Sequence, residues 1–198
     1  MSAPTIDRRL QSPPTRVART RAAAAGAAAA IAAIAIGVRV ALAEPWWVES
    51  ALVAALAVCT VAAVVDTVSR RIPDRLVLAS LVPVAIGLVL LGVAGDARVA
   101  LLTVPAGAVL FALPLAVVHL IVPSAMGFGD VKLALALGAA LGLVEWRLAI
   151  VALCLASGLT VAVAIARRRP TMPFAPGLVV GAALALVLPT LEGPLPWR

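Results

Sequence analysis

Long, nearly uncharged apolar runs are the feature of this sequence that most limits its fold. The hydrocarbon core of a bilayer is about 30 Å thick, and a helix needs about 20 apolar residues to cross it. Lipid offers no partner for backbone N–H and C=O groups, so such runs cross as helices. The sequence therefore predicts an all-α, polytopic integral membrane bundle of about six to seven transmembrane helices. The expected spans are residues 22–43, 47–65, 76–94, 99–122, 126–145, 148–166 and 174–191.

The composition agrees with this fold class and excludes a soluble one. Hydrophobic residues make up 64% of the 198 residues and charged residues 13%, whereas soluble domains have about 45–50% and about 25%. The two cysteines, Cys59 and Cys154, fall inside expected spans and outside any CxxC motif. A free cysteine in such a place behaves as a small hydrophobic residue. Neither a disulfide nor a metal site is expected.

Basic residues are distributed unequally between the two sides of the expected membrane. With the N-terminus in the cytoplasm, 12 of the 16 Lys and Arg residues fall on the inner side, as the positive-inside rule requires. The net charge of +7 is therefore interpreted as a topology signal, and no nucleic-acid partner is expected. The inner basic residues are Arg8, Arg9, Arg16, Arg19, Arg21, Arg70, Arg71, Arg75, Lys132, Arg167, Arg168 and Arg169.

Three parts are expected along the chain. Residues 1–21 are rich in Pro, Ser and Arg and predict a disordered basic cytoplasmic tail. Residues 22–43 predict an N-terminal transmembrane helix that can act as a signal anchor. Its end, from Ala41 to Ala43, has the small-x-small form of a signal-peptidase site, so cleavage there is the alternative. Residues 47–191 form the main membrane-embedded domain.

Two carboxylates are expected at the same depth within apolar spans. Twenty residues from Trp46 give about 30 Å of helix, which places Asp66 near the inner interface. The fifth span opens with MGFGDVKL and is too short to cross if it begins at Lys132, so it is expected to begin near Met126. Asp130 then lies about one helical turn below the inner surface, like Asp66. Ionisable residues inside spans are costly and usually functional.

A close pair of carboxylates has a well-defined chemistry. Once one carboxyl of the pair is ionised, its charge disfavours ionisation of the other. The pair therefore holds one proton near neutral pH, as in aspartic proteases. One carboxylate takes a proton from a water while its protonated partner polarises the carbonyl under attack. Gly127 and Gly129 lack a Cβ, so a peptide backbone can approach closely beside Asp130.

Each acid also has a purely structural interpretation. Asp130 can cap the fifth helix, where a negative charge is favourable. Asp66 can pair with Arg70 one turn later on the same helix. Asp74 can contribute to the cap of the third span.

The neighbouring cation and the single histidine have structural alternatives as well. Lys132 can be an interfacial anchor, and two residues after Asp130 on a helix it faces elsewhere. His119, near the inner end of the fourth span, is expected to pack within the bundle, although it could reach the site.

Three motifs of the sequence resemble those of one known family. GFGDVKL, residues 127–133, resembles the GxGD signature of membrane-embedded aspartyl proteases and is most similar to the prepilin leader peptidase family. DTVSRRIPDRL, which begins at Asp66, is similar to the first aspartate motif of that family. MPFAPGL resembles its Pro-Phe-Gly-Pro segment, with Ala175 where glycine is typical. The three motifs occur in the family's order.

The resemblance implies a GxGD aspartyl protease-like fold and an aspartic endopeptidase without metal or cofactor. It implies Asp66 and Asp130 as the catalytic pair, with cleavage of the basic leader of type IV pilin-like precursors at the cytoplasmic interface. The implied partners are prepilin or pseudopilin precursors and the lipid bilayer, in a bacterial inner membrane. Residues 47–191 would then be the peptidase domain, and without a CxxC motif N-methylation is not expected. The candidate substrate-binding residues are Gly127, Gly129, Pro173, Phe174 and Pro176, and the candidate supporting residues are Lys132 and Asp74.

Two functions of other classes remain as alternatives. A transporter could use Asp66 and Asp130 to bind a proton or cation, although transporter sites tend to lie at the membrane midplane between structural repeats. A pilus assembly factor could keep the fold without catalysis. Substitution of either aspartate would then leave precursor processing unchanged.

Overall fold

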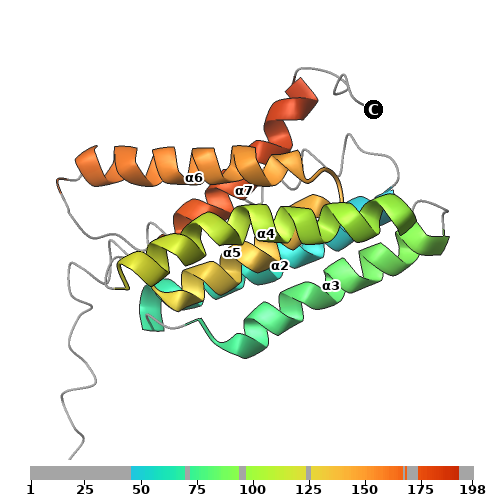
Figure 1. Ribbon diagram of the computed structural model, residues 1–198, viewed down its shortest axis with the longest axis horizontal. Helices are drawn as coiled ribbons and strands as arrows, with labels where there is room; N and C mark the ends of the chain where they lie inside the picture. The colour runs from blue at the N-terminus through green and yellow to red at the C-terminus, as the bar shows by residue number, and fades with distance from the viewer. Residues whose placement is uncertain are drawn as a thin grey trace, which may run out of the picture.

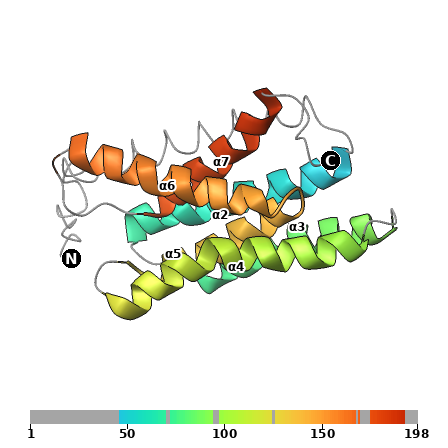
Figure 2. The ribbon, with the colours of Figure 1, turned by 45° about the horizontal axis from the view of Figure 1, so that its top comes forward.

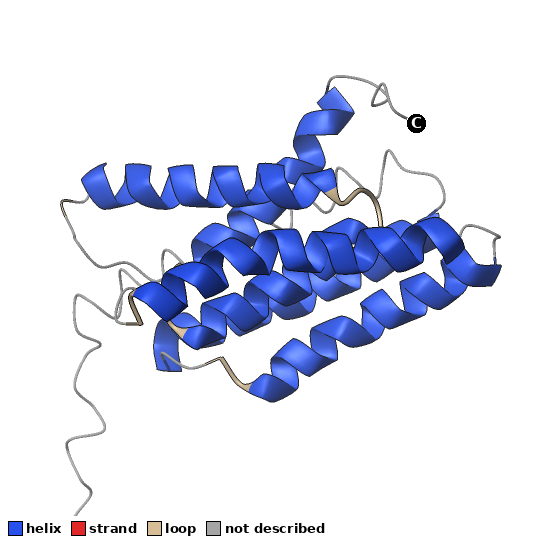
Figure 3. Ribbon diagram, in the orientation of Figure 1, coloured by secondary structure: helices blue, strands red, loops and turns tan. Residues whose placement is uncertain are grey.

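The computed structural model describes residues 46–69, 72–93, 97–123, 126–166, 168 and 174–191. Every regular element in these ranges is an α-helix (Figure 3). The expected basic tail at 1–21 and the expected helix at 22–43 lie outside the described residues. The helices are α2 (Trp46–Ser69), α3 (Asp74–Val93), α4 (Ala97–Ile121), α5 (Phe128–Gly142), α6 (Arg147–Ala166) and α7 (Ala175–Leu191).

Four of these helices are long and apolar enough to cross a membrane. Their apolar stretches are Val48–Asp66, Asp74–Val93, Ala100–Ile121 and Arg147–Ala166. Large aliphatic side chains cover the outer surfaces of these helices, as lipid contact requires, and Val93, Leu102 and Leu120 are among the most exposed. The predicted helical membrane bundle is therefore confirmed, and the chain is a multi-pass membrane protein.

Helix α5 is shorter than the expected span of 126–145. It begins at Phe128 and has 15 residues, or about 22 Å at 1.5 Å per residue. The backbone at Gly127 is extended, with φ −74° and ψ 144°, which keeps Met126 out of the helix. A full crossing is unnecessary because α5 is enclosed by its neighbours: nearly every residue from Asp130 to Gly142 is buried.

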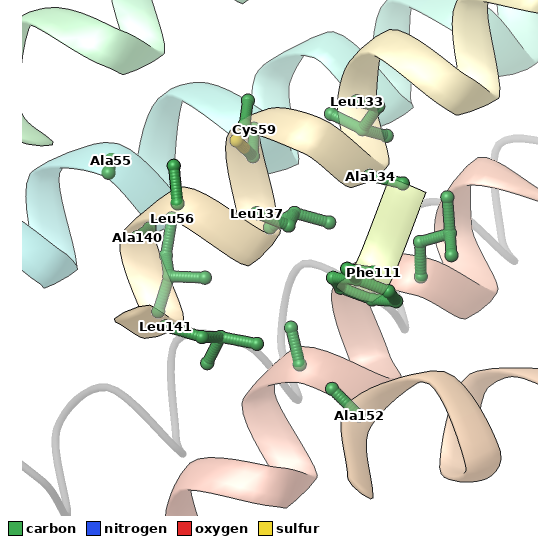
Figure 4. Close-up of a cluster of buried hydrophobic side chains, with 14 of the residues drawn as sticks. Ala55, Leu56, Cys59, Phe111, Leu133, Ala134, Leu137, Ala140, Leu141 and Ala152 are labelled. Atoms are coloured by element: carbon green, nitrogen blue, oxygen red, sulfur yellow. The ribbon is translucent and has the colours of Figure 1, made fainter. Parts of the chain in front are cut away.

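The core of the bundle forms around α5. Leu133, Leu137 and Leu141 of this helix are fully buried. Figure 4 shows them in one cluster with Phe111 of α4 and Leu56 of α2. Helix α4 packs most extensively against α5, and α6 packs against α7.

Glycine allows the backbones of α4 and α5 to approach closely. A Cβ on Gly138 would collide with the carbonyl oxygen of Gly107 and would lie only 2.8 Å from the Cβ of Phe111. Contact between small residues is a common way to join helices in a membrane, where no hydrophobic effect drives them together. Gly138 thus allows close packing of α5 against α4 at this crossing.

One end of the bundle gathers the segments that carry the three motifs. The C-terminal ends of α2, α4 and α6 and the N-terminal ends of α3, α5 and α7 point to the left in Figures 1 and 2. Asp66 lies near the end of α2 and Asp130 near the start of α5. We call this end of the molecule the site end.

Candidate active site

Asp66 reaches the site end because α2 continues through it. The helix ends at Ser69, three residues later, so Asp66 lies in its last turn and is half-buried. Arg70, its alternative partner, lies outside the described residues. The sequence predicted a continuous helix of about 20 residues from Trp46 to Asp66, and α2 is continuous over this range.

Asp130 is the third residue of α5 and is buried, with 9% of its surface exposed. The N-cap residue is Gly127, whose side chain offers no cap. Two hydrogen bonds join the turn in opposite directions: the N–H of Asp130 donates to the carbonyl of Gly127 at 3.1 Å, and the N–H of Gly127 donates to the Asp130 carboxylate. Asp130 therefore also has the capping role considered from the sequence.

A second helix start converges on the same carboxylate. The N–H of Ala175, the first residue of α7, donates to Asp130. Ala175 is completely buried, and α7 packs against both α2 and α5. Helix N-termini stabilise negative charge through their free N–H groups and their dipoles. This donor was not predicted from the sequence. The only feature that pointed to the start of α7 was the resemblance of MPFAPGL to a family motif.

The structure places Asp66 and Asp130 on α2 and α5, two helices that pack against each other, at the site end. The Asp66 carboxylate is close enough to Asp130 to act on it electrostatically. One oxygen of Asp130, Oδ1, is buried and has no hydrogen-bond partner among the described residues. Buried polar atoms are normally satisfied. An acceptor left open beside a second carboxylate is therefore suited to hold a shared proton or a water.

Lys132 and Asp74 form an ion pair beside the site. The Lys132 ammonium lies 2.6 Å from Oδ1 of Asp74 and 5.1 Å from the centroid of the Phe128 ring. Asp74 is the first residue of α3, so the pair links the start of α3 to the first turns of α5. Exposed pairs of this kind contribute about 0–1 kcal/mol, and the contact orients these elements more than it stabilises them.

The two glycines of the GFGD segment have different surroundings. A Cβ on Gly129 would lie 3.2 Å from Cγ1 of Ile72, so the residue accommodates the loop before α3. A Cβ on Gly127 would meet nothing closer than Oδ2 of Asp130, at 3.8 Å. Gly127 is also exposed. Of the two, Gly127 is the position with free space beside the acid.

The remaining candidate residues belong to the start of α7. Phe174 is partly buried against the core, and its carbonyl accepts from Leu178 N–H at 3.1 Å. Pro176 lies in the first turn of the helix, where the missing N–H costs nothing. Pro173 lies outside the described residues.

His119 makes a contact that the sequence did not predict. Its Nδ1 lies 2.8 Å from the carbonyl oxygen of Met126, and its ring centroid lies 5.6 Å from that of Phe128. The histidine therefore binds the segment that leads into α5. In the sequence, the only feature that pointed to this contact was the position of a single histidine near the inner end of the fourth span.

Comparison with known proteins adds an independent observation. A family model described as the type IV leader peptidase family matches residues 53–165, more than half of the chain. The matched region contains Asp66 and the whole GFGD segment. Comparisons with curated proteins and with solved structures give no match. The family match confirms the resemblance inferred from the motifs.

Proposed function

Because the chain belongs to the type IV leader peptidase family, we propose that it is an aspartic endopeptidase with Asp66 and Asp130 as its catalytic pair. Peptidase activity on leader-bearing precursors follows from the family. What we propose beyond the family's activity is that Asp66 and Asp130 carry out the catalysis. The observation that carries it is the buried Oδ1 of Asp130, which has no hydrogen-bond partner in the described part of the chain and lies within electrostatic range of Asp66.

The proposed reaction needs only the two carboxylates and one water. The ionised carboxylate takes a proton from the water, whose oxygen forms a bond to the scissile carbonyl carbon. The protonated carboxyl donates its proton to the carbonyl oxygen and so stabilises the developing charge. The tetrahedral species then collapses: the C–N bond breaks, the carboxyl that took the water's proton gives it to the leaving amine, and the other carboxylate takes back the proton it gave to the carbonyl oxygen, so that the pair again holds one proton.

The proposed substrate is the basic leader of a type IV pilin-like precursor. Such a precursor carries its leader on the cytoplasmic side of a hydrophobic helix, and the scissile bond lies near the inner interface. Asp66 lies in the last turn of α2 and Asp130 in the first turn of α5, and these two helix ends lie at the same end of the bundle (Figure 1). With that end on the cytoplasmic face of a bacterial inner membrane, the bond and the two acids meet at the same depth.

Substitution of each aspartate tests the catalytic pair. We expect Asp66→Asn and Asp130→Asn to lower cleavage of a pilin precursor from the same genome by at least about 100-fold, because neither amide can transfer the proton. The measurement is mass spectrometry of the precursor's N-terminus after reaction with the protein in lipid nanodiscs. Glu145→Gln is the matched control, since this acid lies beyond the opposite end of α5.

The outcomes separate the proposed function from its alternatives. Cleavage at the wild-type rate by both Asn variants would refute the aspartate pair, whereas a non-catalytic assembly factor would leave the precursor intact even as the wild-type protein. A transporter would instead show proton or cation uptake into proteoliposomes that depends on both aspartates, with the precursor left intact. Loss of cleavage in Glu145→Gln as well would point to a general defect.

A further inference from the structure

We propose that His119 is a positioning residue for Asp130 and acts through the peptide group that joins Met126 to Gly127. The inference rests on the proposed function, in which Asp130 is catalytic. It assigns a role to the chain's single histidine, which lies in the last turn of α4.

The two hydrogen bonds that define this role belong to one peptide group. His119 Nδ1 lies 2.8 Å from the carbonyl oxygen of Met126. A carbonyl oxygen only accepts, so Nδ1 carries the hydrogen and donates it. The N–H on the other side of the same peptide bond is that of Gly127, and it donates to the Asp130 carboxylate. Histidine and aspartate are thus connected across a single amide.

The peptide group transmits orientation because it is planar. Rotation about its C–N bond is blocked by a barrier of about 18–20 kcal/mol, so fixing the direction of the carbonyl also fixes the direction of the N–H. Hydrogen bonding at the carbonyl further polarises the amide and strengthens its N–H as a donor. His119 therefore controls a donor that touches the proposed catalytic acid, without contacting the acid itself.

The local sequence explains why such a constraint is needed. Gly127 and Gly129 flank Phe128, and glycine restricts the backbone less than any other residue. The N-cap residue, Gly127, has no side chain that could cap the first turn of α5 itself. Phe128 packs its ring against the imidazole, with the centroids 5.6 Å apart, which holds His119 in the position to donate.

The test compares two variants of similar size. Asn in place of His119 keeps an N–H donor near the position of Nδ1, whereas Leu removes the donor and keeps apolar volume. With cleavage of a pilin precursor as the assay, we expect His119→Leu to lower kcat about five- to tenfold with KM unchanged, the scale of one lost hydrogen bond. His119→Asn should stay within about twofold of wild type.

Each other kinetic outcome would overturn the inference. Equal losses in the two variants would mean that the imidazole acts through its shape. An unchanged kcat in His119→Leu would mean that the bond has no catalytic consequence. A change confined to KM would make His119 a substrate contact.

A second measurement separates this inference from the proposed function. Amide hydrogen exchange of residues 122–130, followed by mass spectrometry, requires no turnover. We expect faster exchange in His119→Leu and wild-type exchange in His119→Asn. Identical exchange in all three proteins would overturn the positioning role even if the precursor is cleaved. The expected pattern without any cleavage would refute the proposed function and leave the His119 contact standing.

Discussion

At the scale of single residues, Gly127 and Gly129 lie two positions apart and predict different consequences for the same substitution. Gly127 has an ordinary φ of −74°, and a Cβ there would make only ordinary contacts, none closer than 3.8 Å. We therefore expect Gly127→Ala to insert and fold like the wild type. If a substrate backbone approaches here, the added methyl group should raise KM several-fold while kcat changes little. Steady-state cleavage of the precursor measures both constants, and wild-type kinetics would show that the substrate does not use this space.

Gly129→Ala should instead disturb the fold of the site. Its Cβ would press on Ile72, whose Cβ, Cγ1 and Cδ1 all lie 3.2–3.3 Å away, and a buried Ile72 must shift to relieve the contact. We expect a loss of about 1 kcal/mol in unfolding free energy and a lower kcat. Thermal unfolding in detergent measures the first. In a protein that carries Ile72→Ala, the side chain that the new Cβ would press on is shorter, so Gly129→Ala should cost less unfolding free energy than in the wild type. Equal losses in the two proteins would contradict steric contact with Ile72.

At this scale, the sequence predicts the position of a residue from its distance along a helix. Asp66 and Asp130 were predicted at one depth from a rise of 1.5 Å per residue and the thickness of a bilayer. The donors around Asp130 were not predicted. The Ala175 N–H, which donates to the carboxylate, comes from α7, and His119 Nδ1, which donates to the Met126 carbonyl, comes from α4. The approach of both depends on how whole helices pack, which no local spacing encodes.

At the scale of elements, the contact between α4 and α5 depends on glycine. A Cβ on Gly138 would lie 2.8 Å from the Phe111 Cβ and 2.9 Å from the Ala108 Cα, so the helices must separate to admit it. We expect Gly138→Ala to reduce stability by about 1–3 kcal/mol, measured by unfolding in SDS from mixed micelles. Cleavage should fall with it, because α5 carries Asp130.

Gly158 of α6 is the matched control for that substitution. A Cβ there meets nothing within 4 Å, so Gly158→Ala should leave stability unchanged or raise it by up to about 1 kcal/mol through helix propensity. A comparable loss in both variants would show that glycine matters for backbone flexibility rather than for close packing.

The boundaries of α5 show where an argument from membrane thickness fails. The sequence predicted a start near Met126 because a shorter helix could not cross about 30 Å of hydrocarbon. That requirement applies to a helix whose ends meet lipid and water. Helix α5 is buried among its neighbours, so protein contacts replace the lipid, and the extended backbone at Gly127 makes the helix begin only at Phe128. Burial of this kind is a tertiary property that the apolar run alone does not reveal.

At the scale of the whole molecule, the direction of each helix was predictable and the identity of the central one was not. Alternating apolar runs and short connections require the chain to cross back and forth, and the described helices do so (Figure 2). Every run, however, has a similar composition of Ala, Leu and Val. Nothing in that composition distinguishes α5, enclosed by the bundle, from α3 and α6, whose surfaces are largely exposed.

The orientation of the bundle in the membrane is a prediction that two cysteine positions can test. The distribution of Lys and Arg places the site end in the cytoplasm. Pro123 is exposed at that end, two residues after α4, and Glu145 lies in the loop between α5 and α6 at the other end. Neither is a basic residue, so replacing either one leaves the charge bias that sets topology intact. Cys154 is replaced by alanine, and the buried Cys59 stays.

A membrane-impermeant maleimide then reports which end faces outward. Glu145→Cys should react in intact cells, because its loop is expected on the outer face. Pro123→Cys should react only in inverted membrane vesicles, because the site end faces the cytoplasm. The reverse pattern would place Asp66 and Asp130 on the outer face, away from a leader that stays in the cytoplasm. The proposed substrate would then be wrong even if both aspartates are catalytic, since a protease and its scissile bond must meet on the same side of the bilayer.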